Sequence, residues 1–90
     1  MPKAVICAYA RTPQGKFRGA LSNYSATELG SKVVKNLMER VNLDPESGIV
    51  DQVYMGQVLQ AGSGQAPARQ VAINAGLPYS TPCTTINKVC

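Results

Sequence analysis

The pattern of hydrophobic and polar positions predicts strands and helices in alternation. Residues 3–10 form an apolar run without polar alternation, which is typical of a strand buried on both faces of a parallel sheet. In residues 25–41 the apolar positions recur every three or four residues, and this spacing predicts an amphipathic helix. Shorter apolar runs predict a second strand at residues 52–60 and a third at 83–89. A short helix that starts near Pro67 is expected between them.

Local signals predict where the two helices begin and end. Ser25 and Glu28 have the Ser-x-x-Glu spacing of a capping box, in which each side chain bonds the backbone N–H of the other residue. Asn42 can adopt the left-handed conformation that ends a helix, and Pro45 prevents the helix from continuing. Gly76 is the equivalent stop for the shorter helix.

The predicted order is therefore β-α-β-α-β, an α/β arrangement. Strands that alternate with helices imply a parallel sheet with right-handed crossovers. Ninety residues allow at most one small domain, which buries only a modest fraction of its surface. Because no helix follows the third strand to cover it, we expect residues 1–90 to be an incomplete domain.

Composition narrows the class of partner. With 44% hydrophobic residues the chain is globular in character. The net charge is +4, but the nine Lys and Arg residues are scattered, whereas a nucleic-acid-binding surface needs a basic patch. No apolar run reaches the length that spans a membrane, and no signal-peptide pattern is present. We therefore predict no nucleic-acid partner and no membrane association.

The cysteines indicate a reducing compartment and no metal site. The chain has three, an odd number at wide spacing, which argues against a disulfide framework. Cys83 and Cys90 are roughly 23 Å apart along an extended strand at about 3.3 Å per residue, too far for a bridge. With no His and no Cys-x-x-Cys, we predict no bound metal and a cytoplasmic location. Cys7 and Cys83 fall in predicted buried strands, where we expect them to act as small core residues.

Two loops carry weak signals for nucleotide or phosphate binding. Residues 62–67 (GSGQAP) lack the third glycine of a dinucleotide fingerprint, because Pro67 stands in its place, and no acidic residue follows. We interpret this segment as a glycine turn that lets two backbones approach closely. Residues 11–19 hold three of the nine positive charges, and we interpret them as a structured surface loop.

Cys90 is the strongest candidate for chemistry. It ends the third predicted strand, a common placement for a covalent nucleophile. Local physics leaves both a catalytic thiol and an inert one open. Lys88 falls on the same strand face as Cys90 and Asn87 on the other, although an ordinary surface lysine is the simpler interpretation of Lys88.

Four segments together resemble the thiolase family, in order and in spacing. They are residues 11–19, 56–62, 64–70 and 84–90. The resemblance implies a five-layered αβαβα fold for the complete protein, with residues 1–90 as an incomplete N-terminal thiolase domain. The Asn-Lys-Val run before Cys90 is similar to that of the biosynthetic, acetoacetyl-CoA branch. Many relatives have Asn as a helix cap where this chain has Ala66.

What this resemblance implies about activity is specific. The complete protein would condense two acetyl-CoA molecules to acetoacetyl-CoA, or run the reverse thiolysis, with coenzyme A thioesters as substrates and no permanently bound cofactor. Cys90 matches the nucleophile, which in the family opens a helix whose N-terminus favours the thiolate. The family's catalytic His and second catalytic Cys have no counterpart in residues 1–90, and we assign neither role to Cys7 or Cys83. The resemblance also implies a homodimer or homotetramer, with residues 64–70 and the third strand near the dimer interface.

Two alternatives stay open. The first is a degradative 3-ketoacyl-CoA thiolase. The second is a non-catalytic half-domain that binds a protein partner, if the chain ends at residue 90. By itself the 90-residue polypeptide is expected to be inactive and poorly stable, because it contains no His and no helix after Cys90.

Overall fold

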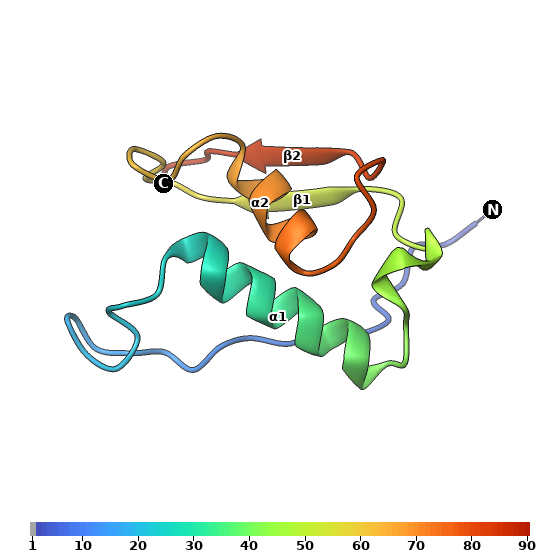
Figure 1. Cartoon of the computed structure of the whole chain (residues 1–90), viewed down its shortest axis with the longest axis horizontal. Coiled ribbons are helices and arrows are strands. Elements are labelled where there is room, and N and C mark those ends of the chain that lie inside the picture. Colours follow the sequence, from blue (N-terminus) through green and yellow to red (C-terminus); the bar gives the residue numbers. More distant parts are fainter. Residues whose placement is uncertain (1) are drawn as a thin grey trace.

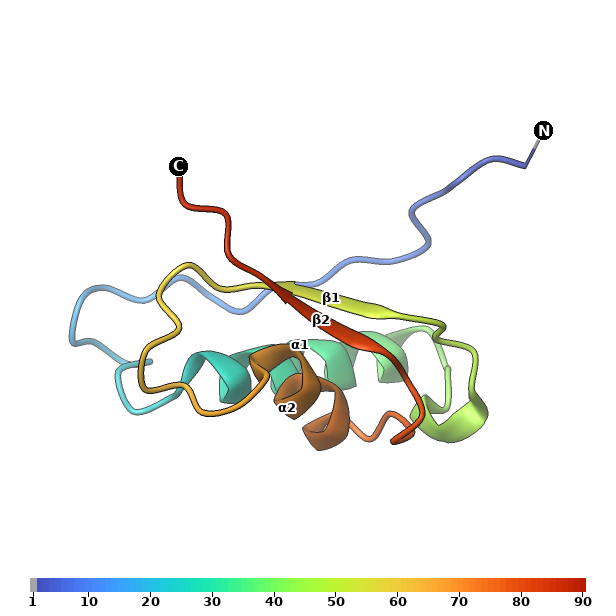
Figure 2. The ribbon, with the colours of Figure 1, turned by 90° about the horizontal axis from the view of Figure 1, so that it is seen from above.

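The computed structural model describes residues 2–90, which form two α-helices, a short 3₁₀ helix and a two-stranded parallel sheet (Figure 1). The elements are α1 (Ala26–Arg40), the 3₁₀ helix η1 (Pro45–Ser47), β1 (Val53–Gly56), α2 (Pro67–Asn74) and β2 (Cys83–Ile86). β1 and β2 pair in parallel, and the chain crosses between them through α2. Both helices lie on the same side of the sheet (Figure 2). The prediction of an α/β fold with a parallel sheet is confirmed.

The predicted strand at residues 3–10 is wrong, because this segment pairs with neither β1 nor β2. Val5, Ile6 and Tyr9 are 76%, 88% and 84% exposed. An apolar run favours a strand, but a strand also needs a neighbour that takes its backbone hydrogen bonds, and this run diverges from the sheet towards the N-terminus (Figure 2). Cys7, expected in the core, is exposed for the same reason.

Both strands are shorter than the apolar runs predict. Each contains four residues, and in each the side chains alternate between half-buried and exposed. The last ladder bond joins the Gln57 N–H to the Ile86 carbonyl at 2.9 Å. Beyond it the two segments are held by side chains, so the regular strand pattern ends there.

α1 begins and ends at the predicted positions. Ser25 Oγ accepts a hydrogen bond from the Glu28 N–H at 3.1 Å, and the Glu28 carboxylate accepts one from the Ser25 N–H at 3.4 Å, which confirms the capping box. At the other end Asn42 has a φ of 57°. The Leu43 N–H donates to the Met38 carbonyl at 2.9 Å, which is the long bond of a Schellman motif.

α2 ends with the same motif. Gly76 has a φ of 95°, and the Leu77 N–H donates to the Ala72 carbonyl at 2.9 Å. Ala72 and Leu77 are buried and join Met38 in the core cluster. The turns that stop the helices therefore also deliver apolar residues to the core.

The N-terminus of α2 is capped by another element. Ala66 occupies the N-cap with a φ of 47° and makes no side-chain capping bond. Thr85 on β2 supplies the acceptor, because its Oγ1 accepts a hydrogen bond from the Ala68 N–H at 2.9 Å. The capping bond that an alanine cannot make is thus replaced by a bond between helix and sheet.

Small residues allow α1 and α2 to approach closely. Ala68, Val71 and Ala72 are buried on α2. On α1, a Cβ added at Gly30 would lie only 2.9 Å from Val71 Cγ2. Because the β-branched Val71 side chain cannot easily rotate away, glycine is required at this crossing.

Gly30→Ala is expected to lower the free energy of unfolding of the complete protein by about 1–3 kcal/mol, because the new methyl group overlaps Val71. This loss would oppose the higher helix propensity of alanine. Urea denaturation measures the change in the free energy of unfolding. In a Val71→Ala background the same change should be neutral or stabilising. An equal loss in both backgrounds would contradict the packing explanation.

Thr85→Val is expected to lower the free energy of unfolding by about 1 kcal/mol, because valine keeps the shape of threonine but cannot accept the Ala68 N–H. Thr85→Ser should retain most of the stability. Thr84→Val, on the exposed face of the same strand, is the matched control and should change stability by less than about 0.5 kcal/mol. Equal losses at both positions in thermal denaturation would show that the cap is unimportant.

Candidate functional site

The candidate site lies at the carboxyl ends of β1 and β2. Parallel strands place these ends at the same edge of the sheet, and the loop from β1 to α2 and the segment after β2 lie at the same end of the molecule (Figure 1). In open α/β sheets this edge is the usual place for a ligand.

Cys90 is exposed at the end of the segment that follows β2, and its thiol is free. Its φ is 36°. Lys88 and Val89 are exposed as well. Within residues 2–90 no hydrogen bond joins Lys88 to Cys90.

Asn87 makes the contact that the sequence pattern did not reveal. It is the first residue after β2, and its Nδ2 donates to the Val58 carbonyl at 2.9 Å. Val58 lies two residues beyond β1. The side-chain amide therefore continues the pairing of the two segments past the last backbone bond.

Glutamine side chains cross-link the loop of residues 57–66. Gln57 Nε2 donates to Ser63 Oγ at 2.6 Å, and Gln60 Nε2 donates to the Gln57 carbonyl at 3.0 Å. From the first turn of α2, Gln70 Nε2 donates to the Ser63 carbonyl at 2.8 Å. The number of glutamines in this short stretch was the only sequence signal for this network, and spacing alone does not show their partners.

The glycines of the same loop supply backbone conformation. Gly62 and Gly64 have φ values of 80° and 81°. A Cβ at Gly62 would meet nothing within 4 Å, and one at Gly64 would lie 3.1 Å from Gln70 Nε2. The expected close approach of two backbones is therefore wrong, and the loop needs glycine for its left-handed turns.

Arg69 organises the segment that enters β2. Its guanidinium donates to the Thr81 carbonyl at 2.9 Å and also to the Tyr79 carbonyl. Cys83 is half-buried against the core, and its Sγ donates to the same Thr81 carbonyl at 3.3 Å. The expected core role of Cys83 is thus partly met, and Arg69 holds the segment that enters β2.

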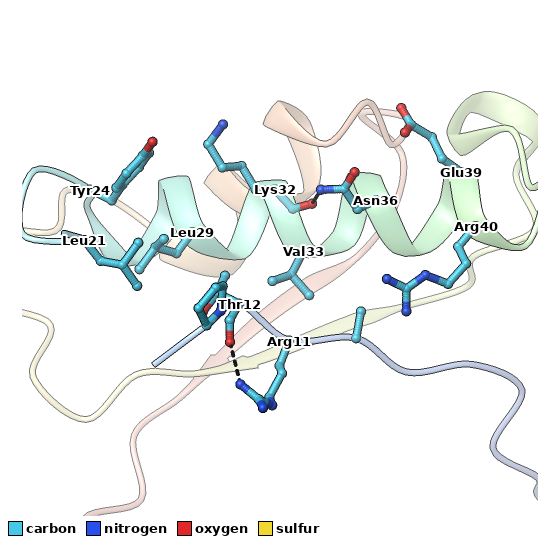
Figure 3. A pocket seen from close by; sticks show the side chains of 12 residues that line it. Arg11, Thr12, Leu21, Tyr24, Leu29, Lys32, Val33, Asn36, Glu39 and Arg40 are labelled. Atoms are coloured by element: carbon cyan, nitrogen blue, oxygen red, sulfur yellow. Dashed lines mark hydrogen bonds between the residues drawn. The ribbon is translucent and has the colours of Figure 1, made fainter. Parts of the chain in front are cut away.

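A second candidate is an open hollow of about 580 Å³ between α1 and residues 10–13 (Figure 3). Its charged lining residues are Arg11, Lys32, Glu39 and Arg40. Arg11 donates to the neighbouring Thr12 carbonyl at 3.1 Å, and the Lys32 ammonium lies 5.7 Å from the centre of the Tyr24 ring. None of the lining residues comes from the strand ends, so this hollow is separate from the site of Cys90.

Two further features of the described residues bear on the site. In residues 2–90, no cluster of three or more His, Cys, Asp or Glu side chains is arranged to hold a metal ion. In the same part of the chain, no helix combines the length and the apolar character needed to cross a membrane.

The family model and similar relatives point to the same protein family. Residues 4–90 match the family model of the thiolase N-terminal domain. The chain is 53% identical over 88 residues to the mitochondrial acetyl-CoA acetyltransferase of Danio rerio, which covers 98% of this chain and 20% of that protein. It is 53% identical over 90 residues to the acetyl-CoA acetyltransferase of Pseudomonas aeruginosa, covering 100% of this chain and 22% of the relative. It is 51% identical over 90 residues to the mitochondrial acetyl-CoA acetyltransferase of Homo sapiens, and the match covers 100% of this chain and 21% of that protein. The chain spans about a fifth of the length of these relatives.

The predicted cytoplasmic location is contradicted by these names. The Danio rerio and Homo sapiens relatives are both named as mitochondrial, although a bacterial relative matches equally well. The prediction relied on unpaired cysteines. Reduced thiols argue against an oxidising compartment, but they do not distinguish one reducing compartment from another.

Gln70→Glu is expected to loosen the loop, because a carboxylate cannot donate to the Ser63 carbonyl and repels it. Backbone amides of residues 61–66 should exchange with solvent about tenfold faster, as expected for the loss of a hydrogen bond worth about 1.4 kcal/mol. Native-state hydrogen exchange of the complete protein measures this. Gln65→Glu is the matched control, since the exposed Gln65 side chain makes no hydrogen bond within residues 2–90. Equal acceleration in both variants would contradict the role of Gln70.

Proposed function

The chain belongs to the thiolase family, and we propose on this basis that the complete protein is an acetyl-CoA acetyltransferase, with residues 1–90 as the first part of its N-terminal domain. The observation that carries the proposal is the extent of the similarity. Relatives named acetyl-CoA acetyltransferase match all 90 residues at 51% and 53% identity, and this span includes the segment that ends in Cys90.

Cys90 is the proposed nucleophile. Its Sγ forms a bond to the carbonyl carbon of acetyl-CoA, the bond from that carbon to the coenzyme A sulfur breaks, and the proton of the Cys90 thiol ends on the released coenzyme A. A second acetyl-CoA then loses a methyl proton and attacks the acetyl carbon. The bond to Cys90 breaks, the thiol regains a proton, and acetoacetyl-CoA leaves. Thiolysis is the reverse of these steps.

The geometry of the described residues supports this role. The thiol is free and exposed, four residues beyond the end of β2, which leaves it accessible to a thioester. Residues 1–90 contain no His, so the base that takes the thiol proton must come from outside these residues. The substrates are coenzyme A thioesters, and the proposed chemistry requires no permanently bound cofactor.

We also propose that the protein assembles as a homodimer or homotetramer. The face of the sheet opposite the helices is open, which indicates that a further layer covers it. Tyr54 and Ile86 on that face are 60% and 38% exposed. Parallel sheets are ordinarily covered on both faces, so the rest of the protein or a second subunit is expected to cover these residues.

The names of the relatives favour the acetyl enzyme over a degradative 3-ketoacyl-CoA thiolase. Thiolysis of short and long 3-ketoacyl-CoA substrates separates the two. A complete protein that prefers long chains would support the degradative alternative.

Cys90→Ala in the complete protein is expected to lower the rate of acetyl transfer by more than about 10³-fold, because the group that carries the acetyl intermediate is gone. Intact-mass measurement after brief exposure to acetyl-CoA should show one added acetyl group in the unaltered protein and none in the variant. Cys7→Ala is the matched control and should keep the adduct. Residues 1–90 alone should form no adduct, since they contain no His. An active Cys90→Ala protein would contradict the proposed nucleophile.

A further inference from the structure

The link between Asn87 and Val58 lies close to Cys90 in sequence. Within residues 2–90, no other side-chain hydrogen bond involves any of residues 87–90. Only two exposed residues, Lys88 and Val89, separate this link from Cys90. Within the described residues, the amide of Asn87 therefore makes the side-chain hydrogen bond that lies nearest to the thiol in sequence.

The acceptor of this bond belongs to a loop that is itself restrained. Gln57 Nε2 donates to the Leu59 carbonyl at 3.0 Å as well as to Ser63 Oγ, so the residues on both sides of Val58 are held. The loop is further attached to α2 through Gln70. A bond to Val58 thus connects the segment after β2 to a loop that other hydrogen bonds restrain, 29 residues away in sequence.

We propose that Asn87 is a positioning residue for Cys90. Its side-chain N–H group holds the carboxyl end of β2 against the loop after β1 and so limits the directions in which the Cys90 thiol can point. A nucleophile misplaced by about 1 Å can lose about 10²-fold in rate, so one such restraint is sufficient to matter. Asn87 acts through the backbone and touches neither the acetyl group nor the thiol. This inference rests on the proposed function of Cys90.

The chemistry of the bond shows which replacements are informative. A carbonyl oxygen accepts and cannot donate, so the side chain at residue 87 must provide a donor. Leucine has nearly the same shape as asparagine and no donor, whereas glutamine keeps the donor on a longer side chain. Because Asn87 is exposed, the loss of this bond is expected to change the overall stability only slightly.

The test compares Asn87→Leu and Asn87→Gln in the complete protein. Asn87→Leu should lower kcat for acetyl transfer about tenfold or more, and Asn87→Gln should recover part of it. The KM for acetyl-CoA should stay within about twofold, because substrate contacts are unchanged. The rate at which iodoacetamide alkylates Cys90 should be altered in Asn87→Leu and closer to normal in Asn87→Gln. Asn23→Leu, at another exposed asparagine, is the control and should leave all these values unchanged.

The outcomes separate this inference from the proposed function. If Asn87→Leu has normal kcat while Cys90→Ala is inactive, the positioning role is wrong and the nucleophile stands. If Cys90→Ala is active, the proposed function itself is wrong. A lowered melting temperature with normal kcat at lower temperature would show that Asn87 only stabilises the fold, which also overturns the proposal. Should Asn87→Leu fail to fold, Asn87→Ala replaces it in the same measurements, because alanine also lacks the side-chain donor.

Discussion

The docking of α2 is the interaction on which the rest of the structure depends. This short helix contacts α1 and both strands. It can come so close because its buried face carries alanines and because Gly30 leaves room for Val71 on the facing helix. A two-stranded parallel sheet has little stability by itself, so the pairing of β1 with β2 relies on the helix that connects and covers them. Thr85 completes the arrangement by capping α2 from the sheet.

Side-chain amides hold the chain in place beyond the ends of the two strands. Regular backbone pairing stops after four residues in each strand, and beyond that point Gln57, Gln70 and Asn87 hold the chain by donating to carbonyl or hydroxyl oxygens. These bonds are directional and short-ranged, so they restrain a loop without burying apolar surface. The proposed nucleophile, Cys90, lies just beyond the last of them. In residues 2–90, the bond from Asn87 is the side-chain hydrogen bond nearest to Cys90 in sequence.

The sequence predicted the local features well and the non-local ones poorly. Ser25, Glu28, Asn42 and Gly76 mark the helix ends because capping and Schellman bonds join residues only three to five positions apart. The apolar run at residues 3–10 predicted a strand that does not pair, since pairing depends on a partner that the run itself does not specify. The compartment was also predicted wrongly, because free thiols are compatible with any reducing environment. At the site, Cys90 was predicted at the tip of the third strand, but β2 ends at Ile86, four residues before it, and the bond from Asn87 was not predicted.

The sequence by itself determined the α/β class, the ends of both helices, and the residues that mark the thiolase family. These follow from short-range periodicity, capping chemistry and motif order, all of which can be read along the chain. Only the tertiary structure decided which apolar runs pair, that Thr85 caps α2 across 17 residues, and that Asn87 reaches Val58 across 29. The physical reason is that a hydrogen bond between distant residues forms only after packing has brought donor and acceptor within about 3 Å, and that distance depends on every element between them.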